Sequence, residues 1–136
     1  MIFIKRLDFE KMTAYAKQLL PEEACGLIAG REVGEDVWIE KVYLLPNAEH
    51  SRVHFTIEPK AQFAAVKDIR RQERKLLGNW HSHPESAAIP SLEDRRFAYD
   101  ITAHYLILSL QGETPVLRSF HIENMEWVAE LLVITS

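Results

Sequence analysis

The chain has 136 residues, a formal net charge of −4 at pH 7 and a single cysteine, Cys25. This length fits one domain over residues 1–136, and 47% hydrophobic residues are enough for a buried core. The acidic balance argues against nucleic acid as the main partner, and one cysteine excludes an internal disulfide. No run approaches the ~20 apolar residues of a membrane span, and the early charges do not fit a signal peptide. We therefore expect a cytoplasmic globular protein.

The N-terminal third predicts a helix followed by a β-hairpin. Residues 8–20 form the helical pattern, which Pro21 ends. Residues 24–45 contain two apolar runs around the polar turn REVGED, a pattern typical of a hairpin, and we expect Cys25 to be buried and inert there. The apolar residues of the helix recur at helical spacing: Phe9, Met12, Ala16 and Leu19 or Leu20.

The next segment predicts a short strand, HFTIEP (54–59), and a second helix over residues 60–77 that Gly78 ends. The inward side chains of this helix are expected to be Phe63, Val66, Ile69 and Leu76. Basic residues cluster at its end and in a later helix, either as solvated faces or as a docking patch for an acidic protein partner. These residues are Arg70, Arg71, Arg74, Lys75, Arg95 and Arg96.

The remaining elements complete an α/β pattern. Residues 79–83, NWHSH, predict a strand and residues 91–101 a short helix. Residues 104–110 and 116–122 predict two further strands around a turn, whereas EWVAELLVI (126–134) fits a strand or a helix equally well. Helices interleaved with strands, with hairpins at both ends, indicate an α/β domain with a mixed β-sheet.

Four polar side chains stand close together in the stretch NWHSHPESAAIPSLED. On a strand, His81 and His83 project from one face, while Trp80 and Ser82 project from the other, where we expect Trp80 to pack in the core. Two adjacent imidazoles are a ready pair of ligands for zinc or a similar metal. Because a catalytic zinc site uses three protein ligands and keeps one position for water, Asp94 at the start of the next helix is the third candidate.

A second interpretation of this stretch needs no metal. Ser91 and Asp94 also fit a helix N-cap with an acidic residue at its third position. A lone histidine is more often structural or exposed than a ligand, so the other four histidines receive no role here. They are His50, His54, His104 and His121.

The spacing H-x-H-x7-S-x2-D, formed by His81, His83, Ser91 and Asp94, resembles the motif of the JAMM metalloproteases, also called the MPN+ domain. The chain is similar in length and order of elements to the compact, stand-alone bacterial members, and the resemblance covers about residues 3–120. It implies a single three-layer domain of the JAMM/MPN (cytidine-deaminase-like) fold, with a mixed β-sheet flanked by helices.

The family places a glutamate upstream of this motif, in a stretch similar to P-x-E-x-x-G. The stretch PEEACG, residues 21–26, matches that pattern and points to Glu23, with Glu22 as the alternative one register away. The resemblance implies that one Zn²⁺ is held by the two histidines and Asp94, although iron or cobalt could occupy the same ligands. It further implies that Glu23 is general base and then acid, and that Ser91 donates a hydrogen bond to the oxyanion.

The resemblance also implies a substrate: a ubiquitin-fold or sulfur-carrier protein, cut after its C-terminal Gly-Gly. Trimming of a sulfur carrier and deconjugation of a ubiquitin-like modifier both remain open, as do the residue released and the oligomeric state.

A catalytically silent MPN scaffold that binds a ubiquitin-like protein is the alternative, but such domains usually lose ligands, and this chain retains them all. A zinc nucleoside deaminase would need a P-C-x-x-C pair, which one cysteine cannot supply. A metal store or sensor would have no use for Glu23 and Ser91.

Overall fold

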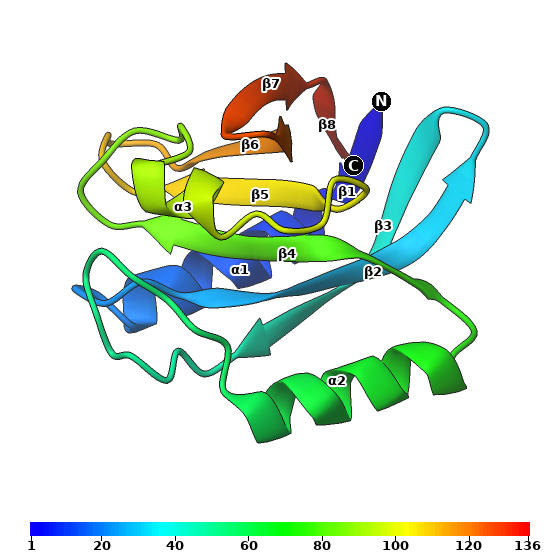
Figure 1. Cartoon of the computed structure of the whole chain (residues 1–136), viewed down its shortest axis with the longest axis horizontal. Helices are drawn as coiled ribbons and strands as arrows, with labels where there is room; N and C mark the ends of the chain where they lie inside the picture. The colour runs from blue at the N-terminus through cyan, green and yellow to red at the C-terminus, as the bar shows by residue number, and fades with distance from the viewer.

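The chain forms eight strands and three helices, which a computed structural model describes over residues 1–136. The strands are β1 (Ile2–Lys5), β2 (Cys25–Val33), β3 (Asp36–Leu45), β4 (Lys75–His83), β5 (His104–Ser109), β6 (Val116–Glu123), β7 (Glu126–Glu130) and β8 (Leu132–Thr135). The helices are α1 (Arg6–Gln18), α2 (Pro59–Arg71) and α3 (Leu92–Arg96). Helices and strands therefore interleave as the sequence predicts (Figure 1).

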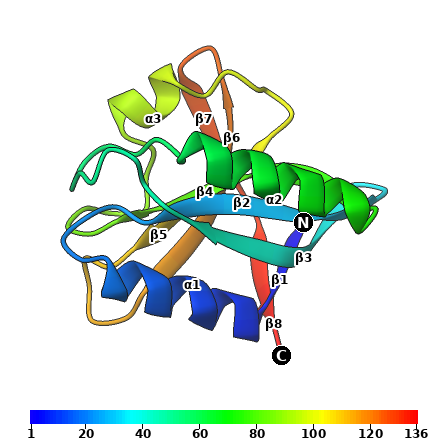
Figure 2. The same cartoon turned by 90° about the horizontal axis from the view of Figure 1, so that it is seen from below.

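All eight strands join one sheet in the order β7-β6-β5-β4-β2-β3-β1-β8. The sheet is mixed, because β1 pairs in parallel with β3 and β8, and β4 with β5, while every other pairing is antiparallel. The outermost strands β7 and β8 are separated in the chain only by Leu131. The sheet therefore curls until its two edges approach each other, and Figure 2 shows β7 running into β8.

Helices cover both faces of this sheet, so the domain has three layers (Figure 2). The side that carries α1 contains the largest core cluster, of 13 buried residues, and the fully buried Trp80 belongs to it. Under α2 lies a second cluster of seven buried residues, including Cys25. The predictions of a mixed three-layer α/β domain, a packed Trp80 and a buried Cys25 are confirmed.

Helix α2 ends earlier than predicted, at Arg71 rather than at residue 77. Leu76 lies in β4 and is 42% exposed, so it does not face inward from a helix. Gly78 also lies within β4, where a Cβ atom would come 1.9 Å from the His104 carbonyl oxygen on β5. The glycine is therefore needed for the close approach of two strands, and the prediction that it ends a helix was wrong.

The inward face of α2 agrees with the prediction at Val66 and Ile69 but not at Phe63. Phe63 points outward and is 67% exposed, with the Lys67 ammonium 5.4 Å from its ring centroid. Ala65 and Ile69 are the buried residues, and both pack in the cluster between α2 and the sheet. Of the basic residues near its end, Arg74 pairs with Glu40 and Lys75 with Glu32, and the others are exposed or half-buried. The docking patch remains a prediction.

The predicted strand HFTIEP is absent, apart from an isolated bridge between Asn47 and Ile57. The Asn47 side chain accepts the N–H of Thr56 and donates to the carbonyl of His54, so a ladder partner is not needed.

Helix α3 spans only five residues, since Asp100 beyond it bonds to the Tyr105 hydroxyl and forms a turn of its own. The C-terminal stretch forms two strands rather than a helix. No helix combines the length and apolar character required to cross a bilayer.

Candidate metal centre and active site

Strand β4 positions the two histidines of the motif. His81 and His83 share the sheet face that α2 and α3 cover, while Trp80 packs on the α1 side. Both imidazoles are buried, with the residues 3% and 4% exposed. The loop after β4 is fixed at two points, because the Leu110 N–H donates to the His83 carbonyl and the Ser109 hydroxyl to the Ser86 carbonyl. The strand therefore presents a rigid pair of nitrogen donors.

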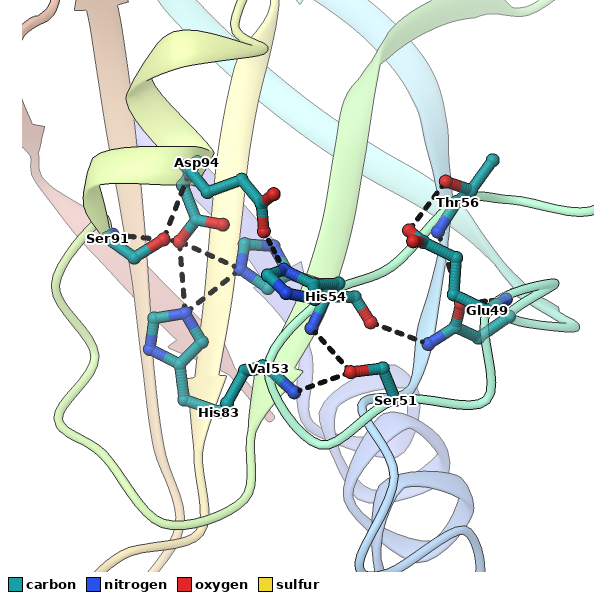
Figure 3. Close-up of polar contacts among 11 residues, drawn as sticks. Glu49, Ser51, Val53, His54, Thr56, His83, Ser91 and Asp94 are labelled. Carbon is teal, nitrogen blue, oxygen red and sulfur yellow. Dashed lines mark hydrogen bonds and ion pairs between the residues drawn. The ribbon is translucent and has the colours of Figure 1, made fainter.

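Asp94 completes a triad with these histidines (Figure 3). Its Oδ2 lies 3.1 Å from His81 Nε2 and 3.0 Å from His83 Nε2, and the two nitrogens are 3.1 Å apart. A tetrahedral ion with bonds of about 2.0–2.2 Å separates its ligand atoms by about 3.3–3.6 Å. The three donors therefore need to move outward by only a few tenths of an ångström to hold a metal ion.

The protonation of the two imidazole rings also suits metal binding. His83 Nδ1 lies 2.8 Å from the Ala87 carbonyl oxygen and so carries the proton, which leaves the Nε2 lone pair free for the centre of the triad. His81 Nδ1 is buried with no hydrogen-bond partner. Burial opposes the charged form of both histidines and lowers the pKa of His81, whereas the Asp94 carboxylate and Ala87 carbonyl raise the pKa of His83.

Asp94 serves the helix and the triad at once. Its Oδ2 accepts the Ser91 N–H at 2.9 Å, and the Ser91 Oγ accepts the Asp94 N–H at 3.0 Å, which is a complete capping box. Burial alone would raise the pKa of Asp94, but the two imidazoles and the Ser91 N–H hold it well below its usual range. The capping interpretation is confirmed, and it is compatible with metal binding because the same oxygen faces both histidines.

Glu23 lies in the connection between α1 and β2 and is only 4% exposed. Its Oε1 is buried without a hydrogen-bond partner. Burial raises the pKa of Glu23 to about 8, with His83 acting in the opposite direction and Asp94 in the same one. Glu22, in contrast, is half-buried and lies 3.5 Å from His50 Nδ1, so the neighbouring glutamate has a different environment.

Four hydrogen bonds hold the backbone around Glu23. Its N–H donates to the Ser51 carbonyl at 2.7 Å, and its carbonyl accepts the Asn47 side-chain amide at 3.1 Å. The next residue, Ala24, exchanges two bonds with Ser82 of β4: the Ala24 N–H donates to the Ser82 hydroxyl, and the Ser82 N–H to the Ala24 carbonyl. The strand that carries the histidines thus also fixes the position of the glutamate.

Sequence reasoning placed Ser82 opposite the histidines without a role and did not single out Asn47 or Phe55. The Phe55 ring stacks on the His81 imidazole, with centroids 4.5 Å apart and planes inclined by 18°. No periodic pattern marks either residue, since both belong to a loop. The four histidines without an assigned role do not join the triad and instead contact carboxylates: Glu22 (His50), Glu93 (His54), Glu130 (His104) and Glu123 (His121).

A cavity of about 520 Å³ adjoins the triad, with His81 and Asp94 among its lining residues. Phe55 and Phe97 contribute apolar walls, and Tyr105 of β5 also lines it. Its volume lies within the range of sites that bind small ligands or short peptide segments. Two of the three triad residues, His81 and Asp94, therefore face this cleft.

Comparison with protein families places the chain among known sequences. The family model described as prokaryotic homologs of the JAB domain matches residues 8–123. A CysO-cysteine peptidase of Mycobacterium tuberculosis is 30% identical over 123 residues, covering 89% of this chain and 83% of the relative. A probable TtuB-protein conjugate cleaving protease of Thermus thermophilus is 33% identical over 94 residues, 68% of this chain and 60% of the relative. A desampylase of Haloferax volcanii is 32% identical over 93 residues, 68% of this chain and 66% of the relative.

Solved structures share the fold. A protein from Desulfitobacterium hafniense, known from its solution structure, is 44% identical with a TM-score of 0.91, covering 99% of this chain and 93% of that one. A protein from Salinibacter ruber is 22% identical with a TM-score of 0.70, covering 99% and 92%. The second likeness shows that the same architecture persists at low identity.

Proposed function

The chain belongs to the family of prokaryotic homologs of the JAB domain, and on that premise we propose that it is a zinc-dependent metallopeptidase. The bond hydrolysed is the peptide or isopeptide bond after the C-terminal Gly-Gly of a ubiquitin-like protein. The observation that carries this proposal is the convergence of His81, His83 and Asp94 beside the buried, unpaired carboxyl of Glu23. The family resemblance drawn from the histidine motif is confirmed by the family match.

Zinc is the metal that this donor set suits best. Two neutral imidazole nitrogens and one carboxylate oxygen leave a fourth tetrahedral position open, as in catalytic zinc sites. When bound, zinc supplies Lewis-acid chemistry, polarising a substrate carbonyl and lowering the pKa of water to about 7. His81, His83 and Asp94 would hold one ion per chain.

Glu23 is the proposed general base and then acid. Burial raises the pKa of this carboxyl well above its usual range, and a cation bound nearby would favour the ionised form, which is the form that acts as a base near neutral pH. Its Oε1 accepts no hydrogen bond from the protein, so this oxygen is available to accept a proton from the attacking water. Glu23 would take that proton and deliver it to the leaving amine.

Ser91 is the proposed oxyanion donor. Its Oγ already accepts the Asp94 N–H, which fixes its position, while its own proton is given to no protein acceptor. The hydroxyl can therefore donate to the substrate carbonyl oxygen as negative charge develops there. Losing one such donor typically lowers the rate by about 100- to 1000-fold.

The substrate class follows from the relatives and the cleft. Relatives named for CysO-cysteine and TtuB-protein conjugates support a ubiquitin-like or sulfur-carrier protein as substrate. We favour carrier trimming over deconjugation, because the CysO-cysteine peptidase aligns over more of both chains. A Gly-Gly end, without side chains, is narrow enough to reach buried donors through the cleft beside His81 and Asp94.

The test uses zinc-loaded protein and a ubiquitin-fold sulfur carrier with a few residues added after its Gly-Gly end. Intact-mass spectrometry follows the carrier, and a mass loss that ends at the second glycine is expected. Glu23→Gln should lower the rate by about 100- to 10,000-fold, the usual contribution of a general base. Glu22→Gln, which changes the half-buried neighbour, is the matched control and should cleave like the wild type.

Two negative outcomes separate the alternatives. Protein that binds zinc and the carrier but cleaves neither this carrier nor an isopeptide-linked one would be a silent scaffold. Protein that neither cleaves nor binds zinc would leave the capping box as the sole role of Ser91 and Asp94. Equal rates for Glu23→Gln and wild type would remove the base assignment.

A further inference from the structure

The buried side-chain amide of Asn47 connects the backbone of the proposed base, Glu23, to the loop that contacts His81. Asn47 is 4% exposed and uses both ends of its side chain. Its Nδ2 donates to the carbonyls of Glu23 at 3.1 Å and His54 at 3.0 Å. Its Oδ1 accepts the N–H groups of Glu49 at 3.0 Å and Thr56 at 3.1 Å. A single side chain thus ties residues 47–57, which we term the Asn47 loop, to the backbone of the proposed base.

The same loop carries the ring that supports a metal ligand. Phe55 lies between His54 and Thr56, the two residues whose backbone Asn47 holds, and it stacks on His81 with centroids 4.5 Å apart. Figure 3 shows this loop, with His54 and Thr56 labelled, running beside His83 and Asp94 of the triad.

His81 depends on this contact more than its partner does. Metal-binding histidines are usually oriented by a hydrogen bond from the second ring nitrogen. His83 has that bond, from Nδ1 to the Ala87 carbonyl, but His81 Nδ1 has no partner. The stacked Phe55 ring is therefore what restricts rotation of the His81 imidazole on the cavity side, which Phe55 and His81 both line.

We propose that Asn47 is a positioning residue, which fixes Glu23 directly and His81 through Phe55, so that base and metal ligand keep a constant separation. The inference rests on the proposed function and deepens it. A purely structural Asn47 would stabilise a turn and nothing else. Its loss would then lower stability without changing catalysis or metal affinity in the folded enzyme.

The first test separates catalysis from folding. Asn47→Ala should lower kcat by about 10- to 100-fold, the usual cost of removing a residue that orients an active-site group, with KM changed less than about twofold. Ser119→Ala is the control, because Ser119 is also buried and hydrogen-bonded but its partner is Glu130 on β7, outside the Asn47 loop. It should lower stability yet leave kcat within about twofold of wild type. Asn47→Asp, which keeps both acceptor bonds, serves if the alanine variant does not fold.

The second test does not depend on activity. Asn47→Ala and Phe55→Leu should each weaken Zn²⁺ binding by about tenfold in competition with a chromophoric chelator, and each should shift the visible bands of the Co²⁺-substituted protein. Unchanged zinc affinity and Co²⁺ spectra in both variants would overturn the His81 half of the proposal. Equal kcat losses in Asn47→Ala and Ser119→Ala would overturn the role of Asn47 in positioning Glu23. If the wild type cleaves no substrate, the proposed function fails, while the metal measurements still decide the role of Asn47.

Discussion

The Ser82 hydroxyl accepts the backbone N–H of Ala24 at 2.8 Å, and the Ser82 N–H donates to the Ala24 carbonyl at 2.9 Å. This pair lies where the strand of the two histidines passes the segment of the proposed base. It connects Glu23 to His81 and His83 through the backbone and one fully buried side chain. Fold and chemistry therefore depend on the same contact.

Replacement of Ser82 should affect both stability and rate. Ser82→Ala leaves the Ala24 N–H buried and unpaired, which should cost about 1–3 kcal/mol of unfolding free energy. It should also lower kcat, because Glu23 loses a neighbouring anchor. Ser119→Ala is the control, since Ser119 is equally buried and bonds to Glu130 on β7. Urea denaturation should show similar losses of unfolding free energy for both variants. A kcat loss in Ser119→Ala as large as that in Ser82→Ala would contradict the expectation.

Asp94→Asn should separate helix capping from metal binding. The asparagine oxygen can still accept the Ser91 N–H, but the charge that faces the two histidines is gone. Zinc at 100 times its Kd should stabilise the wild type by about 2.7 kcal/mol, a gain that a chelator reverses. The variant should gain almost nothing in the same thermal melts. A full zinc-dependent gain in Asp94→Asn would show that this carboxylate is not a ligand.

Ser91 can be tested for its hydroxyl alone. Ser91→Ala should reduce kcat by about 100- to 1000-fold if its proton is given to the oxyanion. The variant also loses an N-cap, at a cost of about 1 kcal/mol, which denaturation will report separately. Ser91→Thr retains the hydroxyl and should recover a large part of kcat. Equal activity of the alanine and threonine variants would assign Ser91 to capping only.

The stability of the metal-free protein should depend on pH through Glu23. Burial raises the pKa of Glu23 from its ordinary 4.5 to about 8, so the folded state holds a proton that the unfolded chain releases. The corresponding stability is fully present below pH 4.5 and is lost as the pH rises through about 8.

Glu23→Gln removes this ionisation. In the presence of chelator, the variant should match the wild type near pH 4.5 and exceed it at pH 9 by a few kcal/mol, about 1.4 kcal/mol for each unit of pKa shift. Glu22→Gln should not diverge from the wild type in this way as the pH rises. Denaturation curves at three pH values provide the measurement, and parallel pH dependences for Glu23→Gln and wild type would disprove it.

The sequence predicted the triad residues because a period and a fixed spacing marked them. The two-residue period of a strand placed His81 and His83 on one face, and the capping pattern brought Asp94 to a helix start nearby. Loop residues have no such period. Asn47 and Phe55 reach the site through side chain–backbone contacts that only the folded chain defines.

The wrong prediction of where α2 ends has a related cause. Gly78 after an apolar stretch is typical of a helix end, but here it permits the close approach of β4 and β5. That contact joins strands far apart in sequence. Local patterns cannot predict such an approach, because it depends on the strand order of the whole sheet.

The curl of the sheet has a mechanical meaning. Because Leu131 alone links β7 to β8 at opposite edges, neither outer strand can peel away without pulling on the other. The two strands should therefore open as one cooperative unit, with the same opening free energy in native-state hydrogen exchange. A local opening at either edge of the sheet should therefore reach the other edge through Leu131.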